Sequence, residues 1–113
     1  MLVKTNLIPK GFDAFTCWPF IFIRPKYIND QGLIKHEMVH YKEQGALSLV
    51  WLLKYFLSKK FRLAAEVRAY KVQIACEGIT LVAAAKLLTT YRLGISFEEA
   101  KSYLMEEKDQ PAL

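Results

Sequence analysis

Two histidines, His36 and His40, stand four positions apart, and they are the only histidines in the chain of 113 residues. On an α-helix this spacing places both imidazole rings on one face, one turn apart, where they can share one Zn²⁺ ion at about 2.0–2.1 Å each. Glu37 lies about 100° further round the helix, so its carboxylate can reach a water molecule on the metal without binding the metal. The segment His36-Glu37-Met38-Val39-His40 therefore predicts a zinc site with a general base beside it.

A catalytic zinc ion needs a third protein ligand and one open position, and several residues could supply that ligand. Glu43 shares the helix face of His40, but three ligands on one helix would spread over about 10 Å of its axis, too far for one ion. Glu77 lies close to the end of its helix, and Cys76 would have to be an exposed thiolate. Glu66 is favoured because it lies in mid-helix, one helical hairpin downstream, where two antiparallel helices can face each other.

Glu66 and Tyr70 also have ordinary structural interpretations. Glu66 could be a surface glutamate paired with Arg62, four positions before it. Tyr70, one turn after Glu66, could aim its hydroxyl at the site as an oxyanion donor, or it could simply pack in the core. The sequence leaves both alternatives open.

The elements that would position these residues form a short β region followed by helices. Residues 2–8 predict a short strand, and residues 12–24 are rich in aromatic and β-branched types, with residues 20–23 as the strand centre. Pro19 and Pro25 bracket that centre, which predicts an edge strand or one that ends early.

The rest of the chain predicts helices at 3.6-residue spacing. The first covers residues 31–44 with Asn29 or Asp30 as its cap, and Ser96 with Glu99 forms a capping box for the last, which ends near residue 107. A second helix is predicted at residues 47–57; it is apolar nearly all round and is therefore expected to be buried. After a connector at residues 58–60, two more helices are predicted at residues 62–76 and 79–90. A loose tail is expected at residues 108–113. The predicted class is α+β and mostly helical, with short N-terminal antiparallel strands, in one domain spanning residues 1–113.

Composition narrows the classes of partner. The chain is 53% hydrophobic and 13% aromatic, enough for a core, although a domain this small gains stability from a metal that crosslinks two segments. Its net charge of +5 and pI of about 9.3 come from dispersed residues, and the densest run, residues 59–62, is short. We therefore expect no nucleic-acid partner.

We also expect no membrane partner, because the longest apolar stretch, residues 46–57, is interrupted by Lys54 and is shorter than the roughly 20 residues that span a bilayer. Cys17 and Cys76 do not make a disulfide framework and are expected to be reduced thiols. No signal peptide is recognised at the N-terminus, so a cytoplasmic location is expected. Self-association into a homo-oligomer stays open, given the hydrophobic composition.

With His36, Glu37 and His40 in an HExxH pattern and Glu66 on a following helix, residues 18–73 resemble the gluzincin metallopeptidases. In size the chain is most similar to the minigluzincins, and it also resembles small HExxH proteins of bacteriophages. The resemblance implies a helical zincin-like core and a zinc peptidase in which His36, His40 and Glu66 bind Zn²⁺ and Glu37 is the general base. It further implies a peptide or protein substrate, held in extended form along the strand around residues 20–24.

The chain departs from the family four positions after the ligand glutamate. Gluzincins often have an acidic residue there that supports a histidine, and this sequence has Tyr70. Two other interpretations remain. One is a non-catalytic module that uses the same site to bind metal or a partner, and the other is a basic helical nucleic-acid binder whose affinity would depend on salt and not on zinc.

Overall fold

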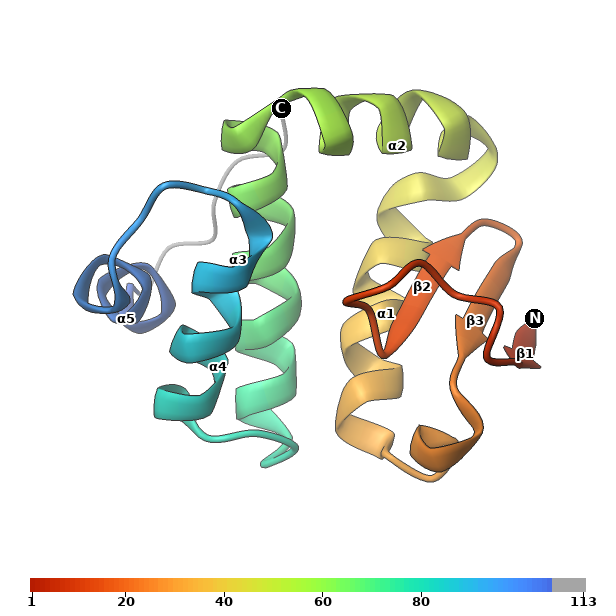
Figure 1. Cartoon of the computed structure of the whole chain (residues 1–113), viewed down its shortest axis with the longest axis horizontal. Coiled ribbons are helices and arrows are strands. Elements are labelled where there is room, and N and C mark those ends of the chain that lie inside the picture. Colours follow the sequence, from red (N-terminus) through yellow and green to blue (C-terminus); the bar gives the residue numbers. More distant parts are fainter. Residues whose placement is uncertain (107–113) are drawn as a thin grey trace.

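The computed structural model describes residues 1–106, which form a three-stranded sheet followed by five α-helices (Figure 1). The strands are β1 (Leu2–Lys4), β2 (Ala14–Cys17) and β3 (Phe20–Ile23). The helices are α1 (Gln31–Gln44), α2 (Ser48–Leu57), α3 (Lys59–Ala75), α4 (Leu81–Leu88) and α5 (Phe97–Met105), with short 3₁₀ turns at Pro25–Tyr27, Gly45–Leu47 and Thr89–Tyr91. The predicted α+β, mostly helical class is confirmed; the predicted helix end at residue 107 and the tail lie outside the described residues.

β3 is the central strand of the sheet, which has the order β1-β3-β2. It pairs in parallel with β1, Leu2 lying opposite Ile21, and antiparallel with β2, Phe15 lying opposite Phe22. Of the two alternatives that Pro19 and Pro25 left open, the edge strand is wrong, whereas an early end agrees with β3 stopping at Ile23. One pairing is parallel where antiparallel strands were expected. Proline outside both ends of β3 stops the strand without removing a hydrogen-bond donor from its interior, so it does not exclude a central position.

Helix α1 begins and ends where its caps predict. The Asp30 carboxylate accepts a hydrogen bond from the Leu33 amide, and Gly45 ends the helix with a positive φ of 51°. The buried side of α1 is mostly polar, with His36, Glu37 and further residues of the site facing the protein interior. Burying polar and ionisable groups is costly, so this face points to a functional site rather than to ordinary packing.

Helices α1 and α3 lie side by side and run in opposite directions, with α2 across their ends (Figure 1). The first turn of α1 lies against the turn after α3, because a Cβ added to Gly32 would stand 2.6 Å from Cα of Gly78. Helix α3 begins at Lys59, with the Ser58 hydroxyl accepting from the Phe61 amide. The predicted connector at 58–60 is thus reduced to the cap residue Ser58.

Helix α2 is not buried all round, contrary to the prediction. Trp51 and Tyr55 face inward, whereas Leu49, Leu53 and Leu57 are 77%, 61% and 76% exposed. The reason is its position: a helix lying across the ends of two others has neighbours on one side only. An apolar pattern without a polar face cannot show which side is covered.

The main hydrophobic core joins α3, α4 and α5. The capping box of Ser96 and Glu99 forms as predicted and begins α5. Buried small and aliphatic side chains make the contact between these helices: Val67, Ala84, Ala85, Leu88, Ala100 and Leu104. Among residues 1–106, no helix combines the length and the apolar character needed to cross a membrane.

Candidate metal centre

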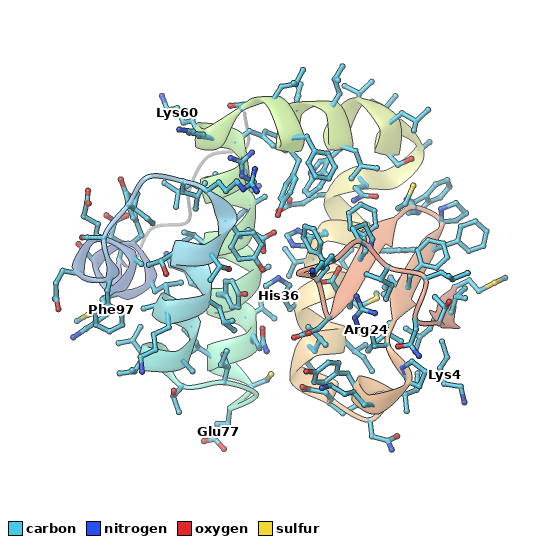
Figure 2. The ribbon with its side chains drawn as sticks, viewed as in Figure 1. Lys4, Arg24, His36, Lys60, Glu77 and Phe97 are labelled. Carbon is cyan, nitrogen blue, oxygen red and sulfur yellow. The ribbon has the colours of Figure 1, made fainter. Side chains whose placement is uncertain are left out.

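His36 and His40 of α1 meet Glu66 of α3 in the interior of the protein. Figure 2 shows the His36 side chain in the space between these two helices. The Glu66 Oε1 atom lies 2.9 Å from Nε2 of His36 and 3.2 Å from Nε2 of His40, and one candidate ligand atom from each residue lies within 4.8 Å of the others. The structure therefore brings together the three residues that the sequence singled out as metal ligands.

The convergence follows from local geometry. The four-residue spacing places both imidazoles on one face of α1, and the antiparallel α3 presents its middle to that face. The side chains are almost fully buried, with 2% of His36, 5% of His40 and 3% of Glu66 exposed. Buried ionisable groups persist when they are paired or bind a metal, and this cluster satisfies the first condition directly.

Two further side chains orient the cluster. Nδ1 of His36 donates to Oε1 of Gln73 at 2.9 Å, which turns Nε2 toward Glu66. The Tyr55 hydroxyl donates to Oε2 of Glu66 at 2.5 Å, which leaves Oε1 facing the two histidines. Partners of this kind fix the tautomer of a ligand histidine and the direction of a ligand carboxylate.

His40 is held by rings rather than by a second hydrogen bond. Its imidazole centroid lies 5.3 Å from that of Trp51 and 6.4 Å from that of Tyr55, both on α2. Within residues 1–106, its buried Nδ1 atom has no hydrogen-bond partner. Among the described residues its hydrogen bond is between Nε2 and Glu66, so this nitrogen is directed to the centre of the cluster.

The charges of the cluster are strongly coupled. Burial alone would lower the pKa of His40, but the Glu66 carboxylate, by charge and hydrogen bond, raises it to about 9. Burial alone would raise the pKa of Glu66, and the two histidines hold it well below its usual value. Burial and the neighbouring Glu66 raise the pKa of Tyr55, which keeps its proton and donates it.

This donor set fits a divalent metal. Because Nδ1 of His36 carries the hydrogen shared with Gln73, a neutral ring presents the lone pair of Nε2 to the same Glu66 oxygen that faces His40. A cation among two imidazole nitrogens and one carboxylate oxygen would satisfy all three acceptors. Two histidines with one glutamate is a ligand set that catalytic zinc ions use.

Glu37 stands beside the three ligands. Its Oε1 accepts a 2.7 Å hydrogen bond from the Thr16 hydroxyl of β2, and its Oε2 lies 3.9 Å from Nε2 of His36. Glu37 is itself only 6% exposed. Its carboxylate is thus adjacent to the cluster without belonging to it, which is where a general base is expected.

Tyr70 packs on His36 and is bonded elsewhere. The two ring centroids are 4.4 Å apart with the rings edge to face, and the hydroxyls of Tyr70 and Tyr91 are 2.8 Å apart. Burial raises the pKa of both phenols, so both stay protonated. The ring of Tyr70 is thus in packing contact with His36, and the hydrogen bond to Nδ1 of His36 goes to Gln73 instead.

The other candidate ligands lie outside the cluster. Glu43 forms an ion pair with Arg68, its Oε2 atom lying 2.6 Å from Nε. The Cys76 thiol donates to the Gln73 carbonyl, and Glu77 follows the end of α3, far from His36 (Figure 2). The alternative of a surface Glu66 paired with Arg62 is wrong, because Glu66 is buried and the Arg62 guanidinium donates to the carbonyls of Tyr55 and Tyr91.

A cavity of about 220 Å³ opens beside the ligands, between β2, α1, α2 and α3. Gln44, at the end of α1, holds part of the β2 edge by accepting from the Trp18 amide and donating to the Thr16 carbonyl, both at 2.8 Å. Phe15 and Thr16 line the cavity beside these two hydrogen bonds, which we call the Gln44 clasp. The cavity therefore has one wall formed by a strand edge that is partly occupied.

Comparisons with known proteins assign no family to this geometry. No model of a protein family matches the chain, and no curated protein or solved structure matches it either. The function has to be argued from the residues of the site.

Proposed function

We propose that the protein is a zinc-dependent peptidase in which His36, His40 and Glu66 bind the metal and Glu37 is the general base. The observation that supports this most strongly is the convergence of three buried donors with a fourth, separately held carboxylate beside them. A purely structural site has no need of the fourth group. The resemblance of residues 36–40 and Glu66 to the gluzincin pattern adds to the proposal.

Each residue of the site has a separate role in the proposed hydrolysis. A bound Zn²⁺ ion supplies a Lewis acid, which acidifies water and polarises a carbonyl group. Glu37 accepts the proton of the attacking water and passes it to the leaving nitrogen. The Thr16 hydroxyl holds Oε1 of Glu37, so that Oε2 stays turned toward His36. Gln73 and Tyr55 keep His36 and Glu66 in place throughout.

An extended peptide would pair with the outer edge of β2, since β3 has partners on both sides. Phe15 and Thr16 of β2 line the cavity, so a peptide on this edge would pass beside Glu37. The Gln44 clasp occupies the part of the edge near Trp18. The proposal therefore favours short or flexible peptides, which need few pairings with the strand, over long rigid ones.

The direct test is Glu37→Gln in the zinc-loaded protein. The variant keeps the shape of the side chain and removes the base, so hydrolysis of a mixed peptide library, followed by mass spectrometry, should fall about 10²–10⁴-fold. Zinc content should stay as in the parent. Glu98→Gln, an exposed glutamate on α5, is the matched control and should leave turnover unchanged. Equal hydrolysis by the parent and by Glu37→Gln would rule out the role of Glu37.

The Gln44 clasp and the limited cavity favour a second candidate, a module that binds metal for stability and cleaves nothing. This alternative predicts that the parent binds zinc and melts at a higher temperature with it, and that no peptide in the library is cut. Gln44→Ala separates the two candidates further. It opens the strand edge, and only an enzyme would then change its rate or its preference among peptides.

A further inference from the structure

The outer surface of α2 and its two ends is composed of only two kinds of residue. Between residues 46 and 60, every exposed side chain is either apolar or a lysine. The apolar ones are Ala46, Leu47, Leu49, Val50, Leu53, Phe56 and Leu57, and the basic ones are Lys54, Lys59 and Lys60. No acidic residue occurs anywhere between Glu43 and Glu66. We call this surface the α2 outer face.

The exposure of these side chains is large and contiguous. Leu47 is 69% and Leu49 77% exposed, and the residues one and two turns further on, Leu53 and Leu57, are 61% and 76% exposed. Single exposed apolar residues are common on protein surfaces, but a continuous set along one helix marks an interaction site.

The opposite side of α2 already has its partners. Trp51 and Tyr55 point inward and contact His40, and Tyr55 also donates to Glu66. The side of α2 that packs on the core is therefore occupied, and the outer face is a separate surface. The inward contacts fix the rotation of α2, and that rotation leaves Leu49, Leu53 and Leu57 exposed.

The lysines on the α2 outer face indicate which kind of partner this surface binds. Lysines that adjoin an exposed apolar helix surface can extend their stems along it and place the ammonium groups at lipid phosphates. Lys60 lies where α2 gives way to α3, at one end of the apolar face (Figure 2). A second copy docked by two-fold symmetry would bring the basic side chains of the two faces together, because the segment between Glu43 and Glu66 contains no acidic residue. An anionic lipid surface balances them.

We propose that the α2 outer face binds the surface of an anionic membrane, with α2 lying in the plane of the interface. Helix α2 has ten residues and lies on the membrane without crossing it. Phe56 of the outer face stacks on Phe15, with ring centroids 6.4 Å apart, and Phe15 lines the cavity of the candidate metal centre. Docking by this face would therefore leave the cavity next to the lipid surface. This revises the sequence-based expectation of no membrane partner.

The test is flotation of the full chain with vesicles made of equal parts phosphatidylcholine and phosphatidylglycerol, against vesicles of phosphatidylcholine alone. Each lysine near an anionic surface contributes about fivefold to the partition constant, so the anionic vesicles should bind at least about tenfold more tightly. Added salt should weaken that binding. Equal binding to both kinds of vesicle, or none to either, would overturn the proposal.

Substitutions then locate the binding face. Leu49→Glu with Leu53→Glu should lower partition into anionic vesicles at least about tenfold, because the apolar contact is lost. Val72→Glu with Val82→Glu is the matched control: both valines are exposed, on α3 and α4, and the charge change is the same. This control should bind within about twofold of the parent. Equal losses in both double variants would show that charge alone matters and would contradict the assignment to α2.

Two further measurements keep the result unambiguous. Lys59→Gln with Lys60→Gln leaves the leucines in place and should reduce the preference for anionic lipid, and it serves as the test if the leucine variant does not fold by circular dichroism. Sedimentation of the parent without lipid should give a monomer. A dimer that the leucine variant dissociates, together with no vesicle binding, would assign the face to a second copy instead. Glu37→Gln should bind vesicles like the parent, so this inference can fail or succeed apart from the proposed peptidase activity.

Discussion

At the scale of single residues, side chains from β2, α2 and α3 hold the candidate metal centre in place. The Thr16 hydroxyl donates to Oε1 of Glu37, the Tyr55 hydroxyl donates to Oε2 of Glu66, and Oε1 of Gln73 accepts from Nδ1 of His36. Each contact fixes the direction of one group of the site, so each should affect the site without touching a metal directly.

Gln73 provides the first prediction at this scale. Gln73→Leu removes the acceptor for Nδ1 of His36 while keeping a side chain of similar size, so the ring loses its fixed orientation. Loss of such a supporting hydrogen bond lowers metal affinity about 10–100-fold, and zinc competition with a chromophoric chelator would measure it. Gln31→Leu, at an exposed position of α1, is the control and should bind zinc like the parent. Unchanged affinity in Gln73→Leu would show that His36 is oriented by packing alone.

The sequence predicted which residues meet at the site, but not which residues hold them. The spacing of His36 and His40 follows from helix geometry, and Glu66 followed from the antiparallel placement of the next long helix. Thr16 and Tyr55 could not be found in this way, because they come from β2 and α2 with no fixed spacing to the cluster. Gln73 left a signal, since it lies two turns after Glu66 on the same helix.

The pKa of His40 gives a prediction about pH. In the metal-free protein this pKa is about 9, above the ordinary value of 6.5, so the folded chain holds the proton more tightly than the unfolded chain. The resulting stabilisation is complete below pH 6.5 and is lost as the pH rises through about 9. The melting temperature of metal-free protein should therefore fall over this window.

Zinc should remove that fall, because the metal replaces the proton and binds more tightly as the pH rises. His40→Gln lacks the titrating ring, so its metal-free melting temperature should change less between pH 6.5 and 9. Thermal melts monitored by circular dichroism would measure both proteins. An equal fall in parent and variant would assign the pH dependence to other groups.

At the scale of elements, local signals were reliable and long-range ones were not. The Asp30 cap, the positive φ at Gly45 and the Ser96–Glu99 capping box set the bounds of α1 and the start of α5, and each is a contact within a few residues. The central place of β3 depends on pairing with residues 2–4, about which its own sequence says nothing. The exposure of α2 depends likewise on what lies above and below it, which an apolar pattern cannot reveal.

The contact between Gly32 and Gly78 yields a prediction about how the elements are held. Gly32→Ala would place a Cβ 2.6 Å from the backbone of Gly78, where nothing flexible can yield. Overpacking of this kind costs about 1–3 kcal/mol, whereas glycine to alanine in an open helix stabilises by about 0.5–1 kcal/mol. Urea unfolding of the variant should therefore show a loss of stability. A gain would mean that α1 and the turn after α3 are further apart than described.

At the scale of the whole molecule, the cluster acts as a crosslink between α1 and α3. A domain of this size has a limited hydrophobic core, and His36, His40 and Glu66 lie between α1, which packs against the sheet, and α3, which packs against α4. A metal there would join α1 and α3 as well as support chemistry. The proposed peptidase and the alternative module, which binds metal and cleaves nothing, therefore share one prediction. Both require that His36, His40 and Glu66 bind a metal together.

The most direct test of that requirement is zinc content after dialysis against buffered free zinc, for the parent, Glu66→Gln and the matched control Glu43→Gln. The control removes a carboxylate that pairs with Arg68 outside the cluster. The account predicts one zinc ion per chain in the parent and in Glu43→Gln, and loss of zinc from Glu66→Gln. Full occupancy in Glu66→Gln, or no zinc in the parent, would contradict it.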